Sequence, residues 1–213
     1  MRIVLIASTL FYCTALTVEA RAQEISLELA VGLTDCTDEY CEDGTIVFDE
    51  TSPGLGVLGA AWVRVHPLLQ LGLSGHVSYV ATDEPRGVDT TLRYASLDGG
   101  VRVQPPLELP VNLFGGLTFG WSFFDTFFES DLDDGSGSLS GPNVALHLGG
   151  DWPLGSSFAL GALFKYAFPF WSDYCYESDA LGDDCMDPED AFDDEDLPNV
   201  WFLGLLARWT PGA

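Results

Sequence analysis

The sequence predicts an all-β fold, an eight-stranded antiparallel up-and-down transmembrane β-barrel with four long acidic external loops. Three observations predict it. Eight segments alternate, residue by residue, between a bulky apolar set and a set of small or polar residues, as strands do when one face meets lipid and the other a narrow lumen. The links between these segments are alternately long and short, and most acidic residues lie in the long links.

The outward face of each segment is found by taking every second residue. In chain order these outward sets run from Ile25 to Leu33 (residues 24–34), Leu55 to Val65 (55–66), Leu71 to Tyr79 (70–80), Leu97 to Val103 (91–103), Val111 to Phe123 (111–124), Val144 to Trp152 (143–152), Phe158 to Phe168 (157–168) and Trp201 to Trp209 (199–209). Eight is an even number, so both chain ends are expected on one side of the membrane.

Segment 157–168 distinguishes a membrane barrel from a soluble one most clearly. Its outward face is wholly apolar or aromatic, whereas its other face is mostly small and carries a single charge, Lys165. A strand that covers a core in water has a strongly polar second face, and this segment has none. A soluble lipocalin-like carrier, the rival all-β fold, would reverse the polarity and place polar residues outside and bulky apolar ones within.

The links and the aromatic residues follow the same plan. Long links cover residues 35–54, 81–90, 129–142 and 172–198, and they hold 26 of the 32 acidic residues that follow residue 22. The other links are short and contain proline, as periplasmic turns are. Aromatic residues lie at both ends of the segments, as interfacial girdles do: Tyr79, Trp121, Phe123, Phe168, Phe170 and Trp201 near the long links, and Trp152, Phe158 and Trp209 near the short ones.

The N-terminal residues predict export. Residues 1–22 combine Arg2, an apolar run and the small-residue motif Ala20-Arg21-Ala22, which together are typical of a signal peptide. Residues 23–213 then form one barrel domain. The chain has 33 acidic and 8 basic residues and a net charge of -25. This charge excludes nucleic acid as an expected partner, because phosphate binding needs the opposite sign.

Four cysteines remain after the signal peptide, in an exported and therefore oxidising setting. They are Cys36, Cys41, Cys175 and Cys185. Closure within each loop is the simplest of the three possible disulfide pairings, and pairing between the loops stays open. Because the first and last strands adjoin in a closed barrel, the two bridges could stiffen one surface patch. Zinc is the alternative use of four cysteines, and the absence of C-x-x-C spacing argues against it.

The pattern across residues 23–213 resembles the small OmpA/OmpX-type family of eight-stranded outer-membrane barrels. The resemblance implies an outer-membrane location in a Gram-negative-type cell envelope, with extracellular loops and periplasmic termini. It is a likeness of pattern, without a residue-specific motif. One departure is at the C-terminus: outer-membrane barrels commonly finish on an aromatic residue used as an assembly signal, whereas Trp209 is followed by Thr210, Pro211, Gly212 and Ala213.

The first candidate site is the lumen, which in an eight-stranded barrel is just wide enough for side chains to fill. Charged groups there must pair with one another or hold water. The predicted lumen network consists of Glu28, Arg64, His66, His76, Asp98, Arg102, His147, Asp151, Lys165 and Arg208. The chain is not expected to be an enzyme. The alternative is a lipid hydrolase or acyltransferase in which Ser78, His76 and Asp98 act as nucleophile, base and acid.

The second candidate site is the acidic loop set, whose oxygen ligands suit calcium. The predicted ligands are Asp131, Asp133, Asp134, Asp193, Asp194, Glu195 and Asp196. Their spacing does not match an EF-hand loop, so weak calcium binding is the only cofactor expected. The expected role is structural or one of surface interaction, with outer-membrane lipid, divalent cations, surface polysaccharide or protein as partners. A narrow channel for ions or small solutes is an alternative.

Overall fold

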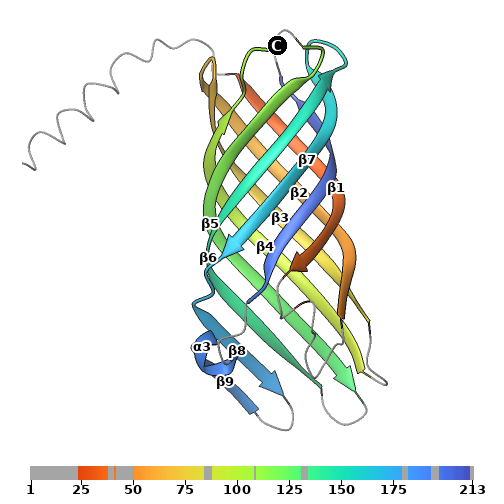
Figure 1. The fold of residues 1–213 in the computed structure, drawn as a ribbon, viewed down its shortest axis with the longest axis vertical. Coiled ribbons are helices and arrows are strands. Elements are labelled where there is room, and N and C mark those ends of the chain that lie inside the picture. Colours follow the sequence, from red (N-terminus) through yellow and green to blue (C-terminus); the bar gives the residue numbers. More distant parts are fainter. Residues whose placement is uncertain are drawn as a thin grey trace, which may run out of the picture.

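The computed structural model describes residues 24–37, 41, 50–83, 88–107, 109–130, 134–178, 182–192 and 197–211. Eight long strands wind around a common axis and close into a barrel (Figure 1). They are β1 (Ile25–Thr37), β2 (Glu50–His66), β3 (Leu69–Asp83), β4 (Val88–Val103), β5 (Asn112–Ser130), β6 (Asp134–Pro153), β7 (Phe158–Pro169) and β10 (Asn199–Trp209). The predicted signal peptide lies outside the described residues.

Every neighbouring pair in the ring is antiparallel, and two pairings close it. β5 pairs with β6 along its whole length, and β1 pairs with β10 from Leu27↔Trp209 to Thr37↔Asn199. We call the end with the short links after β2, β4 and β6 the turn end, and the opposite end the loop end. The closed eight-stranded antiparallel barrel predicted from the sequence is confirmed.

The alternation of the sequence becomes the two faces of the barrel wall. Side chains of the outward sets are exposed, with Leu205 at 78% and Leu97 at 68%, whereas their neighbours along each strand are buried. On β5 the apolar outward set from Leu113 to Phe123 extends over about 25 Å of barrel height, and Asp125 follows it toward the loop end. Among the described residues, no helix is long and apolar enough to cross a membrane.

The strands continue beyond this apolar band at the loop end, which corrects the predicted third loop. Residues 129–142 were expected to form a loop, but β5 runs to Ser130 and β6 begins at Asp134. The segment Gly135-Ser136-Gly137-Ser138 has the composition of a linker, yet its backbone pairs with β5 on one side and with a further strand on the other. Backbone pairing in water needs no bulky outward face, so the lipid pattern could not reveal it.

The fourth long link also contains regular structure. β8 (Asp173–Ser178) pairs with residues 135–140 of β6, and β9 (Gly182–Met186) pairs with β8 to form a hairpin beside the barrel mouth (Figure 1). The short helix α3 (Pro188–Ala191) follows. β9 is the outer edge of this sheet, and the Cys185 N–H donates to Asp184 Oδ1 at 2.9 Å. A short, acidic and partly capped strand is a poor template for further strand pairing.

Candidate functional site: an ion-paired lumen and an acidic loop end

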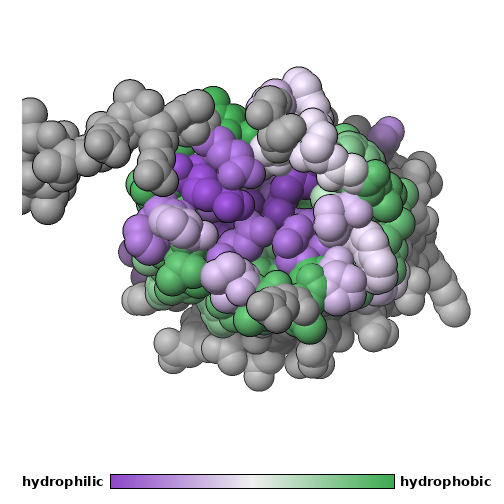
Figure 2. Space-filling view, turned by 90° about the horizontal axis from the view of Figure 1, so that it is seen from above, coloured by the Kyte–Doolittle hydropathy of each residue, from purple (hydrophilic) through white to green (hydrophobic). Residues whose placement is uncertain are grey.

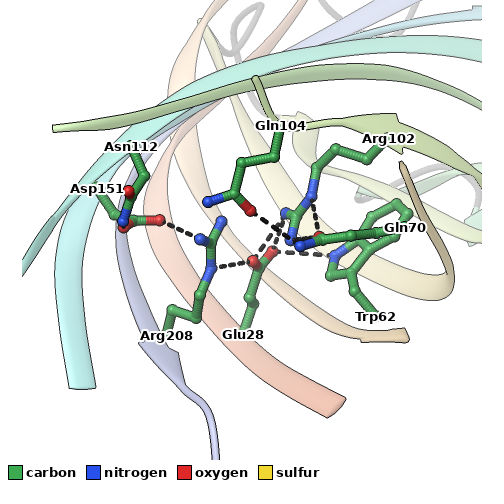
Figure 3. A network of polar contacts seen from close by, with 8 residues as sticks. All are labelled: Glu28, Trp62, Gln70, Arg102, Gln104, Asn112, Asp151 and Arg208. Carbon is green, nitrogen blue, oxygen red and sulfur yellow. Dashed lines mark hydrogen bonds and ion pairs between the residues drawn. The ribbon is translucent and has the colours of Figure 1, made fainter. Parts of the chain in front are cut away.

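The lumen near the turn end is organised around one carboxylate, that of Glu28 on β1. Arg102 Nη1 lies 2.7 Å from Glu28 Oε1 and 2.9 Å from Oε2, and Arg208 Nε lies 2.7 Å from Oε1. Trp62 Nε1 donates to Oε2 at 3.0 Å. All four side chains are buried. Figure 3 shows that the two arginines reach this carboxylate from opposite sides, so the acceptor sites of Glu28 are occupied.

Both arginines are also held by a second acceptor and by an aromatic ring. Arg208 Nη1 lies 2.5 Å from Asp151 Oδ2, and Arg102 Nε donates to Gln70 Oε1 at 2.8 Å. The guanidinium carbons of Arg102 and Arg208 lie 4.5 and 4.9 Å from the centroid of the Phe114 ring, within the range of cation–π attraction. The fixed fork of a guanidinium suits this arrangement better than a flexible ammonium would.

Two amides extend the network toward the turn end (Figure 3). Asn112 Nδ2 donates to Asp151 Oδ1 at 2.9 Å, and Gln70 Nε2 donates to Gln104 Oε1 at 2.9 Å. Together with Glu28, Trp62, Arg102 and Arg208 they complete an eight-residue set, which we call the Glu28 network. It draws strands from opposite walls of the barrel, and Gln104 just after β4, into one set of contacts, so it ties those walls together.

A second ion pair lies deeper in the barrel. Lys165 Nζ on β7 is 2.6 Å from Asp98 Oδ2 and 3.0 Å from Ser96 Oγ on β4, and all three residues are buried. The sequence predicts that Lys165 lies near Glu28, Asp98 or Asp151, and the partner is Asp98. The six charged groups of these two clusters comprise three acids and three bases, so the described interior is electrically balanced.

Apolar side chains fill the lumen around these clusters. One layer contains Ala30, Leu58, Phe114, Leu163, Phe202 and Leu206. A second layer, at the loop end, includes Leu92, Tyr94, Phe124 and Leu139, with Trp171, Tyr174, Phe192 and Leu197 packed against it. An interior cavity of about 10 Å³ is lined in part by Thr118, His147 and Lys165. This is about the space of one water molecule.

The structure does not bring Ser78, His76 and Asp98 together as a nucleophile, base and acid. Among the described residues, Ser78 Oγ and His76 Nε2 have no hydrogen-bond partner. The imidazole ring instead packs edge-on against Tyr94 and Phe202, with centroid distances of 5.3 and 5.0 Å. Asp98 is engaged by Lys165. The geometry required for activating a serine is therefore absent from this described part of the lumen.

Two members of the predicted lumen network lie outside it. His66 is exposed, because a register shift between Arg64 and His66 in the pairing of β2 with β3 breaks the two-residue alternation. Its Nδ1 accepts the N–H of Leu68 at 3.3 Å. Arg64 faces the open mouth at the turn end, where its side chain is 34% exposed and its Nε lies 3.3 Å from Glu24 Oε2. The remaining predicted members, Glu28, His76, Asp98, Arg102, His147, Asp151, Lys165 and Arg208, are buried.

Several uncharged residues of the Glu28 network were absent from the predicted set. They are Trp62, Gln70, Gln104 and Asn112. Trp62 and Asn112 belong to inward positions in the sequence pattern, and an indole or amide at such a position must find a hydrogen-bond partner. Gln104 follows the last residue of β4, where alternation gives no information.

The loop end carries both disulfides, each closed within its own segment. Cys36 pairs with Cys41, and Cys175 pairs with Cys185 across the β8–β9 hairpin. Cys36 and Cys41 belong to the buried layer at the loop end, whereas Cys185 is exposed. One bridge therefore fastens the end of β1 into that layer, and the other staples an exposed hairpin.

The predicted calcium ligands lie outside what the structure describes. Asp131, Asp133, Asp193, Asp194, Glu195 and Asp196 are not among the described residues, and only the backbone of Asp134 is, at the start of β6. Within the described ranges, no group of three or more His, Cys, Asp or Glu side chains is placed to hold a metal ion. Calcium binding at these loops stays a prediction.

Three solved structures share this fold. A major outer membrane protein from Thermus thermophilus superposes with a TM-score of 0.64 at 14% identity, over 89% of this chain and all of that one. Neisserial surface protein A gives 0.56 at 9% identity, over 87% and 96% of the chains. Ail, the attachment invasion locus protein of Yersinia pestis, gives 0.53 at 15% identity, over 88% and 99%.

These likenesses establish the fold of outer-membrane β-barrels and no specific role. No protein-family profile matches the chain, and no curated protein matches it either. Solved barrels of this fold include an outer membrane protease from Escherichia coli as well as surface proteins. The activity must therefore be argued from the residues of this chain.

Proposed function

We propose that this chain is an outer-membrane protein of the small OmpA/OmpX-type group that acts through its acidic loop end. In this proposal the loop end faces the cell exterior and binds cationic partners, while the termini face the periplasm. The observation that carries the proposal is the segregation of charge. The interior is balanced, whereas Arg93 is the only Lys or Arg side chain described at the loop end, and it is already paired with Asp125.

The β8–β9 hairpin and α3 supply the described part of the acidic surface. Six acidic residues on or beside them are exposed: Asp173, Glu177, Asp183, Asp184, Asp187 and Asp190. Between β6, β8 and β9 lies a shallow groove of about 390 Å³, to which Glu177, Asp183 and Asp184 contribute. Clustered charges of one sign raise the local concentration of counter-ions. Multivalent cations and basic segments of surface proteins are therefore the partners we expect.

The filled lumen supports a role in surface interaction over the alternative of a narrow channel. Both apolar layers and both ion-pair clusters would have to move for a solute to pass. The charge also favours a partner unlike that seen with Ail, which has been solved in complex with the heparin analogue sucrose octasulfate. A polysulfate is an anion, and the acidic loop end described here would repel it.

The test uses the full mature chain in nanodiscs of uncharged lipid. We expect an octalysine peptide to bind at low ionic strength and to bind at least about tenfold more weakly near 0.5 M salt, where exposed charges are screened within a few ångströms. The quadruple variant Asp173→Asn, Glu177→Gln, Asp183→Asn, Asp184→Asn should weaken binding. Glu24→Gln, a change of the same kind at the turn end, should not. Absence of binding, or an equal loss in both variants, would contradict the proposal.

A further inference from the structure

The turn end of the barrel opens into a polar cavity of about 290 Å³. Its lining includes Ser26, Arg64, Gln104, Ser157 and Arg208, and we call it the vestibule. Figure 2 looks onto this end and shows hydrophilic residues gathered within the mouth, with hydrophobic residues around its rim. The vestibule lies directly beyond the Glu28 network, which forms its floor (Figure 3).

One buried guanidinium has a donor left over in this cavity. Arg208 is only 6% exposed; its Nε bonds Glu28 Oε1 and its Nη1 contacts Asp151 Oδ2. Its Nη2 is buried and has no hydrogen-bond partner among the described residues. A charged donor that is removed from water without an acceptor is costly, and such groups call for a ligand or ordered water.

A second guanidinium lines the same cavity. Arg64 makes one ion pair within the described chain, to Glu24 at 3.3 Å, and both side chains are partly exposed. An arginine has five N–H donors in a fixed fork, so this single long contact leaves Arg64 with donors for a ligand. Arg64 stands on β2 and Arg208 on β10, with β1 between them, so both face the vestibule from one side of its wall.

The carboxylates of the site cannot supply the missing acceptors. Glu28 already receives Arg102, Arg208 and Trp62, and Asp151 receives Arg208 and Asn112. Donors therefore exceed acceptors around the vestibule, which favours an anion. Planar, bidentate recognition of a carboxylate is the chemistry for which guanidinium groups are best suited.

The size and lining of the vestibule define the rest of the ligand. At about 30 Å³ for each water-sized group, 290 Å³ holds about ten non-hydrogen atoms. Serine hydroxyls from Ser26, Ser156 and Ser157 and the amide of Gln104 offer hydrogen bonds to hydroxyl groups. We propose that the vestibule binds a small hydroxylated carboxylate whose carboxylate group docks on Arg208 and Arg64. This site is independent of the proposed role of the loop end.

The experiment follows the arginine side chains directly. The full mature chain, labelled with 15N-arginine in detergent micelles, is titrated with sodium gluconate at constant ionic strength, and the Nε–Hε signals are recorded by NMR. We expect saturable shifts of Arg64 and Arg208 in the millimolar range and no shift of Arg93, which lies on the outer wall near the loop end. Glucose, a neutral molecule of similar size, should produce no saturable shift.

Two arginine-to-glutamine variants separate the site from general charge. Arg64→Gln removes one docking group from a partly exposed position, so the barrel should still fold, and gluconate should bind about tenfold more weakly. Arg93→Gln removes a comparable partly exposed, paired arginine and should leave binding unchanged. The proposal is overturned if wild-type signals do not move, if glucose shifts them equally, or if Arg64→Gln binds gluconate as wild type does. The wild-type comparison of gluconate with glucose decides the matter even if a variant folds poorly.

Discussion

Glu28→Gln is expected to lower the free energy of unfolding by about 3–5 kcal/mol, which is the usual effect of removing one partner from a buried ion pair. The substitution keeps the size of the side chain but removes the charge that Arg102 and Arg208 share at 2.7 Å. Arg102 would then be buried with Gln70 as its remaining polar side-chain partner among the described residues. Urea unfolding of the protein refolded into lipid vesicles measures the change.

Glu24→Gln is the matched control for this experiment. Glu24 also pairs with an arginine, but both side chains are partly exposed at the turn end, and pairs of this kind contribute about 0–1 kcal/mol. A large loss for Glu28→Gln beside a small one for Glu24→Gln would support the network as the main polar stabiliser of the lumen. Equal losses for the two variants would contradict that view.

Leu205→Arg is expected to cost about 2–4 kcal/mol when the protein is folded in a bilayer, as cations do near the membrane midplane of a barrel. Leu205 is 78% exposed on β10, and it lies midway between Leu203 and Ala207 on the outward face of that strand. If this face met water, an exposed leucine could be replaced within about 0.5 kcal/mol of neutrality. The same vesicle unfolding assay distinguishes the two cases.

Leu154→Arg serves as the position control for that substitution. Leu154 is also exposed, at 59%, but it lies in the turn between β6 and β7. Near the interface the expected cost falls to about 0–1 kcal/mol. If both variants have the same small effect, the outward face is not in contact with hydrocarbon.

The sequence pattern predicted the ring of strands because a strand between lipid and a narrow lumen leaves a two-residue signature. The same alternation correctly assigned Glu28, Asp98, Lys165 and Arg208 to the interior. It could not select the partner of Lys165, since the register between two strands far apart in the sequence is set by the closed ring. At His66 the argument failed, because the shift in strand pairing changes which side the next residue faces.

The loop end was the least predictable part for a physical reason. Outside the membrane neither face of a strand must be apolar, so the extension of β5 and β6 and the β8–β9 hairpin leave no such signature. The acidic composition of residues 172–198 predicted a solvated surface, but the aromatic side chains of Trp171, Tyr174 and Phe192 pack on the layer that fills the barrel mouth. Hydrophobic residues in an acidic loop were the available signal.

The closed membrane barrel is tested most directly by gel mobility after cell fractionation. The protein should be found with the outer-membrane fraction and should need detergent for extraction. An unboiled sample should migrate differently from a boiled one, because the closed ring of eight strands, cross-linked through Glu28, resists unfolding by detergent alone. Recovery in the soluble fraction, with identical mobility before and after boiling, would contradict the account.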